Sequence, residues 1–282
     1  MADEPIFERL PGEEYQDNRS RLAIFFGVLY RKFWRLITVN LMFMVFNAPA
    51  IIFSYFLSVY LVILFIPEAA AIQMDEIRLM VFDSGFPTVM FFMAVPIITV
   101  GPAQAGLTYL LRCYSYERPT FTWLDFKDKM KENLKQGIAV SFINLFLLLF
   151  LILDLYLYPR VSDGGALFSI ANGLIIVMFI LFLMASLYIY PMMVTYELRI
   201  RDLYKNAVLF ALARFVPNLA ILFLCLLVII GPTIILFLTS NGIVLLFTYL
   251  LYACFGFTLP GLIINFLVNP VMDKHLNRKE QG

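Results

Sequence analysis

The chain has 282 residues, of which 62% are hydrophobic and only 15% charged, and its net charge at pH 7 is +1. Soluble domains carry about 25% charged residues, so this composition is typical of a membrane protein. The small net charge provides no basic field of the kind that binds nucleic acid, and we expect no nucleic-acid partner.

A polar, acidic arm at residues 1–20 comes first, and residues 21–35, RLAIFFGVLYRKFWR, predict a basic amphipathic entry helix. Long runs without a charged residue follow. About 20 apolar residues span a bilayer, and a central Lys, Arg or Asp costs about 2.5–3.5 kcal/mol. We therefore predict an all-α polytopic membrane helix bundle over residues 21–270, with a cytoplasmic tail at 271–282. Its six transmembrane helices are predicted at about 36–66, 86–111, 137–158, 166–195, 206–237 and 243–269.

The basic residues predict the orientation of these spans. If the N-terminus is cytoplasmic, 19 of the 21 Lys and Arg residues lie in cytoplasmic segments, and only Arg78 and Arg160 lie outside. Cytoplasmic loops of membrane proteins carry such an excess of basic residues. We therefore expect both termini in the cytoplasm. A faint repeat, Tyr116-Glu117 and Tyr196-Glu197, precedes two outward spans and suggests three parallel helical hairpins.

The end of the second span, GPAQAGLTYLLR, combines a Gly-Pro break with small residues. Proline removes a backbone donor and kinks a helix, and small residues four apart let two backbones approach closely. We predict a tightly packed kink at Gly101, Pro102, Ala105 and Gly106. The alternative is a hinge or a partly unwound segment that lines a cavity, as broken helices do in transporters.

Residues 122–135 predict an amphipathic helix on the cytoplasmic surface, with Thr122 and Asp125 as its N-terminal cap. In one interpretation this helix anchors the bundle at anionic headgroups, and in the other it docks a partner. Its side chains recur at helical spacing in an apolar row, Trp123, Phe126, Met130 and Leu134, and in a lysine row, Lys127, Lys131 and Lys135.

Residues suited to catalysis or metal binding are sparse. His275 is the single histidine, the three cysteines are far apart, and no common hydrolase, nucleotide-binding or zinc-protease motif occurs. We therefore predict no catalytic residue, no cofactor and no metal site. Amides inside the spans predict hydrogen bonds between helices, and they also suit a neutral polyol. These amides are Asn40, Asn47, Gln104, Asn144, Asn172 and Asn265.

Several stretches resemble the YesL-like family of bacterial integral membrane proteins. They are FWRLITVNLMFMVFNAPA, GPAQAGLTYLLR with the following TFTWLDFKDKMKENLKQG, and YPMMVTYELRIRDLYKNAVLFAL. The resemblance covers most of residues 20–270, and the acidic arm departs from the short N-terminus of the family. It implies a Gram-positive bacterial host, a multi-pass protein of the plasma membrane, and genes beside carbohydrate ABC importers and glycan-degrading enzymes. It supplies no catalytic residues, because the molecular role of the family is not established.

The resemblance implies, and the absence of catalytic and nucleotide-binding motifs agrees with, a non-catalytic accessory or assembly subunit that associates with the permease subunits of a carbohydrate ABC importer. In this hypothesis the small residues of the second span pack inside the bundle, and the helix at 122–135 is the docking surface. The proline-broken spans and their amides favour the alternative, an autonomous small-solute transporter or channel. A membrane enzyme ranks third, because it would require acids and histidines that converge at one depth in the membrane.

Overall fold

The computed structural model of the protein describes residues 20–48, 101–161, 165–238 and 242–276. All regular structure in these ranges is α-helical, as the predicted fold class requires. Residues 49–66 of the predicted first span and 86–100 of the second lie outside the described residues. The helices are α1 (Arg21–Arg31), α2 (Phe33–Phe46), α6 (Gly101–Ser115), α7 (Thr122–Glu132), α8 (Leu134–Val161), α9 (Ala166–Met193), α10 (Ile200–Ala213), α11 (Phe215–Leu238), α12 (Gly242–Phe255) and α13 (Thr258–Leu276).

Three of the described helices contain segments long and apolar enough to cross a membrane: Leu134–Leu155, Phe168–Met193 and Phe215–Pro232. The pair α12 and α13, bent by 46° at its junction, would be a fourth if it counts as one span. Only 28%, 17% and 17% of the most apolar windows of the three segments are buried inside the chain, so most of their side chains face outward. Surfaces of this kind are typical of a membrane-embedded protein, because lipid and not water is their favourable solvent.

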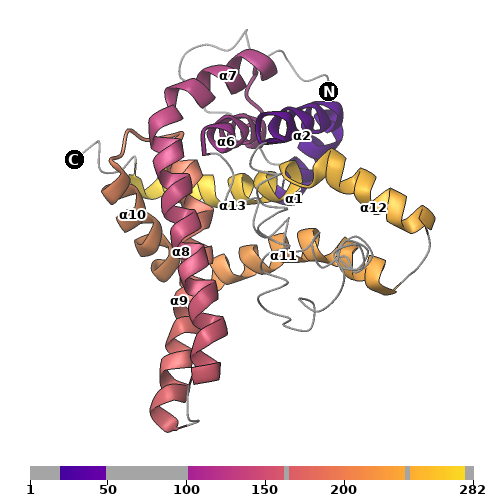
Figure 1. The fold of residues 1–282 in the computed structure, drawn as a ribbon. Helices are drawn as coiled ribbons and strands as arrows, with labels where there is room; N and C mark the ends of the chain where they lie inside the picture. Colours follow the sequence, from indigo (N-terminus) through magenta and orange to yellow (C-terminus); the bar gives the residue numbers. More distant parts are fainter. Residues whose placement is uncertain (1–19, 49–100, 162–164, 239–241, 277–282) are drawn as a thin grey trace.

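Helix α6 occupies the centre of the described bundle. Eleven of its fifteen residues are buried, and it packs against α7, α8 and α13. It contributes Ala105 to a core built mainly from α9, α10 and α13. A second core is built mainly from α6 itself and α2, with Val28 of α1 and Phe126 of α7 packed against them. Figure 1 shows α8 and α9 side by side as a long hairpin that extends beyond the other described helices.

Three apolar helices each follow a shorter helix, with a single non-helical residue between the two. Lys32 separates α1 from α2, Asn133 separates α7 from α8, and Arg214 separates α10 from α11. In each case the carbonyl of the break residue accepts a hydrogen bond of 2.7–2.9 Å from the backbone N–H four residues further on. The described residues thus contain one arrangement three times, a short helix, a one-residue break and an apolar helix.

The predicted fifth span, 206–237, covers the end of α10 and most of α11, with a break between them. Pro217 in the first turn of α11 has no N–H to donate to the preceding turn, so one continuous helix would lack a hydrogen bond there. Asn218 satisfies the carbonyls at the end of α10 instead. Its Nδ2 donates to the oxygen of Phe210 at 2.9 Å and to that of Ala211 at 3.3 Å.

The bend between α12 and α13 is held by a side chain from α2. Pro260, in the first turn of α13, cannot donate a backbone hydrogen bond, which interrupts the helix. The fully buried Asn40 bonds backbone groups that the bend leaves without a partner in a continuous helix. Its Oδ1 accepts from the N–H groups of Phe257 and Thr258 at 2.9 and 3.1 Å, and its Nδ2 donates to the carbonyl of Ala253 at 2.7 Å. One asparagine thereby joins α2 to both halves of the bent pair.

We predict that Asn40→Leu lowers the free energy of unfolding by about 2–4 kcal/mol, because two buried N–H groups lose their acceptor and each costs about 1–3 kcal/mol. Asn47→Leu is the matched control. Asn47 follows Asn40 by two helical turns, on the same face of α2, and is also fully buried. Its Nδ2 donates only to the carbonyl of Phe43 in the same helix, and its Oδ1 has no partner. Denaturation in detergent micelles measures both variants. Equal losses would contradict a special role for Asn40.

Candidate functional site

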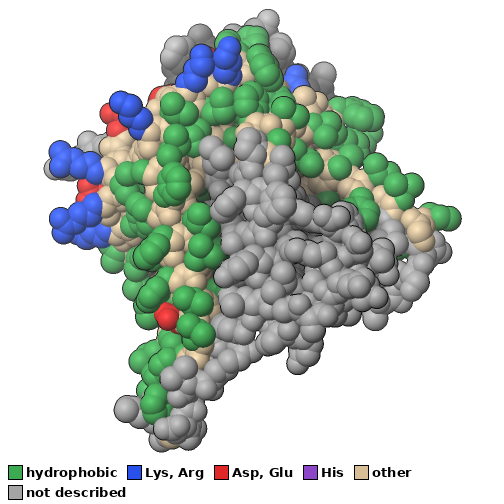
Figure 2. Space-filling view, viewed as in Figure 1, with side chains coloured by type: hydrophobic (Ala, Val, Ile, Leu, Met, Phe, Trp, Pro, Cys, Tyr) green, Lys and Arg blue, Asp and Glu red, His purple; other side chains and the backbone are tan. Residues whose placement is uncertain are grey.

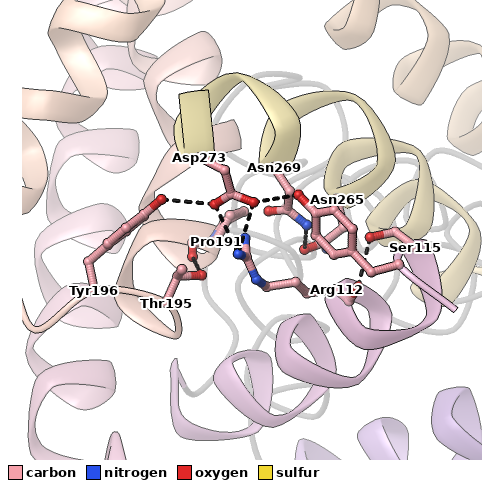
Figure 3. A network of polar contacts seen from close by, with 9 residues as sticks. Arg112, Ser115, Pro191, Thr195, Tyr196, Asn265, Asn269 and Asp273 are labelled. Atoms are coloured by element: carbon pink, nitrogen blue, oxygen red, sulfur yellow. Dashed lines mark hydrogen bonds and ion pairs between the residues drawn. The ribbon is translucent and has the colours of Figure 1, made fainter. Parts of the chain in front are cut away.

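Three helix ends meet at the carboxylate of Asp273, in the last turn of α13 (Figure 3). Nη2 of Arg112, in the last turn of α6, lies 2.9 Å from Oδ1 and 3.1 Å from Oδ2. The hydroxyl of Tyr116, just after α6, donates to Oδ2 at 2.5 Å, and that of Tyr196, just after α9, donates to Oδ1 at 2.9 Å. We call these four residues the Asp273 junction.

The turn after α6 positions Tyr116 and is itself unusual. Glu117 has φ of 55°, in the left-handed region where glycine is the common residue at a helix C-terminus. The N–H of Glu117 donates to the carbonyl of Tyr114, and that of Arg118 donates to the carbonyl of Cys113. This pair of bonds is a Schellman motif, which satisfies the last carbonyls of α6 and turns the chain toward α7. Glu117 also forms an ion pair with Arg31 at the end of α1.

The Asp273 junction is mostly shielded from solvent, with the side chain of Arg112 12% exposed and that of Asp273 25% exposed. Burial, followed by the hydrogen bond to Asp273 and the charge of its carboxylate, raises the pKa of Tyr116 and of Tyr196 above the usual tyrosine range. Both phenols therefore stay protonated at physiological pH and remain donors. Three donors on one carboxylate hold the helix ends in a fixed relation.

A cavity of about 160 Å³ lies between α6, α8, α9, α11 and α13. Three of the six predicted span amides line it, namely Gln104, Asn144 and Asn265. Nδ2 of Asn269 donates to Oδ1 of Asn265 at 3.1 Å, and Figure 3 shows Asn269 next to Asp273 and Arg112. The amide row on α13 therefore connects the cavity wall to the Asp273 junction.

The four residues of the predicted kink are all buried. A Cβ on Gly101 would overlap the carbonyl of Gly137 in α8, and a Cβ on Gly106 would lie 2.7 Å from the carbonyl oxygen of Phe126 in α7. Pro102 stands in the first turn of α6, where its missing N–H removes no bond inside the described helix. The segment before Gly101 lies outside the described residues, so the kink stays a prediction.

The predicted apolar row of the surface helix divides between the interior and the surface. Phe126 is fully buried and Met130 is half-buried against the same core, whereas Trp123 and Leu134 are 57% and 47% exposed. Phe126 is therefore committed to packing within this chain. The side chains of the lysine row are all exposed: Lys127, Lys131 and Lys135.

The predicted N-terminal cap of this helix was wrong in one residue. Phe121 and not Thr122 is the N-cap of α7, because Thr122 already has helical geometry and its hydroxyl contacts Tyr114 at 3.3 Å. Asp125 has the capping role expected of it, since its Oδ2 accepts from the N–H of Phe121 at 2.9 Å.

Sequence reasoning does not identify Asp273, which falls in the predicted tail at 271–282. The structure continues α13 to Leu276, so the residue is helical. One signal does point to it. The repeated Tyr-Glu pairs place Tyr116 and Tyr196 at equivalent helix ends, and two such tyrosines beside apolar helices need an acceptor. In the described residues no group of three His, Cys, Asp or Glu side chains is placed to hold a metal ion.

We predict that Asp273→Asn lowers the free energy of unfolding by about 1–3 kcal/mol, because the largely buried Arg112 loses its counter-charge. Tyr116→Phe and Tyr196→Phe should each cost about 0.5–1.5 kcal/mol, the usual contribution of one hydrogen bond. The exposed Asp128→Asn on α7 is the control and should change little. Thermal unfolding in detergent checks all four, and an unaltered Asp273→Asn protein would exclude a stabilising junction.

A second pair of variants tests the contact between α6 and α8. Gly101→Ala should destabilise the protein by about 1–3 kcal/mol, because the added methyl forces two backbones apart. Gly173→Ala in α9 meets no atom within 4 Å of its new Cβ and should stabilise by about 0.5–1 kcal/mol through helix propensity. The same unfolding measurement compares them. An increase in stability for both variants would show that the backbones of α6 and α8 do not approach closely at Gly101.

Residues 36–155 match the protein-family model described as "Protein of unknown function, DUF624", the family to which YesL-like proteins belong. The match begins in α2 and ends near the end of α8, before the turn of the α8–α9 hairpin. It includes Arg112, Tyr116 and α7, and it ends before Tyr196 and Asp273. No curated protein and no solved structure matches the chain.

Proposed function

We propose that the protein is YesL-like and acts as a non-catalytic accessory or assembly subunit of a carbohydrate ABC importer in the plasma membrane. It would have six spans and two cytoplasmic termini. The family match over residues 36–155 and the apolar helices support a membrane protein of this type. The assignment of a carbohydrate importer as the partner rests on the resemblance to the YesL-like family. The observation that carries the docking role is an uncovered face on α7.

We call this face the α7 surface and define it by the exposed side chains of Phe121, Trp123, Leu124, Lys127 and Lys131. The three apolar side chains are 78%, 57% and 54% exposed. Large apolar groups clustered on a surface favour a covering partner or membrane. The lysines beside them favour a partner that presents acidic residues around an apolar groove.

The α7 surface rests on a rigid base, which favours specific docking over a loosely attached helix. Phe126 is buried beside this surface, and the ring of Phe46 in α2 lies 5.5 Å from the ring of Phe126 and 5.9 Å from that of Trp123. The Asp273 junction fixes Tyr116 six residues before α7 begins at Thr122. A preorganised surface loses little conformational entropy when it binds a partner.

The Asp273 junction also supports the proposed topology. Tyr116, Tyr196 and Asp273 belong to three segments that the positive-inside rule assigns to the cytoplasm, and their direct contacts require one common end of the bundle. Figure 2 shows Lys and Arg side chains gathered over α7 and α10, at the end of the molecule opposite the tip of the α8–α9 hairpin.

Affinity purification of the full-length protein in a mild detergent tests this function. Permease or ATPase subunits should co-purify with the wild type, and Trp123→Ala should reduce their recovery about fivefold or more, as loss of an interface tryptophan does. The other tryptophan of the chain, Trp34 on α2, is 77% exposed, so Trp34→Ala is a matched control that should leave recovery unchanged. Absence of importer subunits from the wild-type eluate, or equal recovery with both variants, would count against docking at α7.

A second candidate function is an autonomous small-solute transporter or channel. It is favoured by the broken pair α12 and α13, because Gly256, Phe257 and Pro260 at the break line the cavity, as interrupted helices do in transporters. Proteoliposomes that contain only this protein separate the two functions. Protein-dependent uptake of a labelled mono- or oligosaccharide would favour the second candidate, and tight vesicles would favour the first.

A further inference from the structure

We propose that the cavity between α6, α8, α9, α11 and α13 binds the hydroxyl-bearing end of an uncharged membrane amphiphile. The inference does not depend on partner docking, and it applies whether the occupant is moved or only held. It follows from three properties of the cavity wall: its lack of charge, its mostly apolar character, and a small set of polar groups without partners.

No charged side chain is among the described residues that line the cavity, and thirteen of those nineteen residues are apolar or glycine. An ionised ligand would lose its hydration without gaining a counter-charge, which costs several kcal/mol or more. A polyol would have to satisfy many hydroxyls at once on a wall that offers few partners. The wall therefore favours a ligand with an apolar body and a single neutral polar group.

Three polar side chains of the cavity wall are able to hydrogen-bond the polar group of such a ligand. Thr108 is 3% exposed and lines the cavity, and its hydroxyl forms no hydrogen bond with a described residue. Gln104, one turn earlier on α6, likewise has no side-chain hydrogen bond to the described part of the chain. Asn144 is 2% exposed and accepts from Tyr204 at 2.7 Å through Oδ1, which leaves its Nδ2 available.

Unmet donors and acceptors in a buried apolar wall cost free energy until a ligand or water reaches them. A hydroxyl suits this set because it donates one hydrogen bond and accepts others, which a carbonyl or an alkyl end does not. The remaining polar side chains of the wall are already engaged. Ser186 donates to Phe182, and Asn265 donates to Gly261 and accepts from Asn269.

The size of the cavity limits how much of the ligand enters. A dry engineered cavity of about 150 Å³ binds benzene, so about 160 Å³ suits roughly six to eight non-hydrogen atoms. The head and first carbons of a long-chain alcohol fit this volume. The rest of such a chain would lie along the apolar helices, where lipid is already the surrounding solvent.

Photolabelling tests the proposal. Full-length protein in phosphatidylcholine nanodiscs is labelled with an octanol that carries a diazirine, and the labelled peptides are mapped by mass spectrometry. We expect saturable labelling of α6, α9 and α13. Unlabelled octanol should compete about fivefold better than octane, the difference expected for one hydrogen bond.

Two variants make the test specific. Ser186→Phe fills the cavity and should abolish saturable labelling. Ser169→Phe is its control, because Ser169 is also on α9 and bonds its own helix one turn back, but it is exposed and does not line the cavity. Thr108→Val keeps the volume and removes the hydroxyl, so the preference for octanol over octane should fall about fivefold. This variant decides the matter if Ser186→Phe does not fold.

Several results would overturn the proposal. One is unsaturable labelling spread over the lipid-facing helices, and another is equal saturable labelling of the two serine variants. Displacement of the probe by glucose or glycerol as effectively as by octanol would replace the amphiphile with a water-soluble polyol. An unchanged octanol preference in Thr108→Val would remove the assigned hydrogen-bonding site.

Discussion

The structure depends on one constraint, which is that lipid offers no hydrogen bonds to a polar group inside the membrane. Each backbone N–H and C=O group there must find its partner within the protein. The constraint is visible where helices are interrupted. Asn40 supplies bonds at the bend between α12 and α13, Asn133 donates to Lys129 at the end of α7, and Asn218 covers the last carbonyls of α10. Proline interrupts two of these three helices, and in all three an asparagine completes the bonding. The breaks are thereby rigid corners that set the directions of the following apolar helices.

At the ends of the bundle, the Asp273 junction likewise satisfies buried polar groups within the protein. This has a consequence for the proposed function. A single carboxylate joins the ends of α6, α9 and α13, and from two of these ends the chain enters a short amphipathic helix, α7 or α10. The orientation of α7 is therefore determined by the membrane bundle. In the proposed function, a partner bound at the α7 surface would sense the arrangement of the spans through Tyr116 and Arg112. The cavity shares α6 and α13 with the junction, so an occupant there would act on the same helices.

Much of the architecture is predictable from composition and charge, because uncharged runs of membrane length leave few alternatives to helices. The break at Asn133 lies within a few residues of the predicted boundary between the helix at 122–135 and the span at 137–158, whereas the break at Arg214 was not predicted, because the span at 206–237 was drawn through it as one helix. The amides were recognised as groups that bond between helices, but only tertiary structure tells Asn40, which bridges three helices, from Asn47, which bonds its own. Phe126 shows a similar limit. Its place in a helical stripe predicted an exposed docking residue, whereas α6 and α2 cover it. Asp273 was missed because its three partners are 77 to 161 residues away in the chain.

The central position of α6 has a consequence for how the protein is made. Its sequence, GPAQAGLTYLLRCYS, is rich in small and polar residues, so by itself it has weak affinity for the hydrocarbon interior. Its neighbours include α8, which follows α7 in the chain, and α13, which is synthesised much later than α6. Until both arrive, Gly101 has no opposing backbone and Arg112 has no counter-charge. The middle of the chain therefore stays incompletely packed until α13 has been made, and its stability depends on contacts that form late in synthesis.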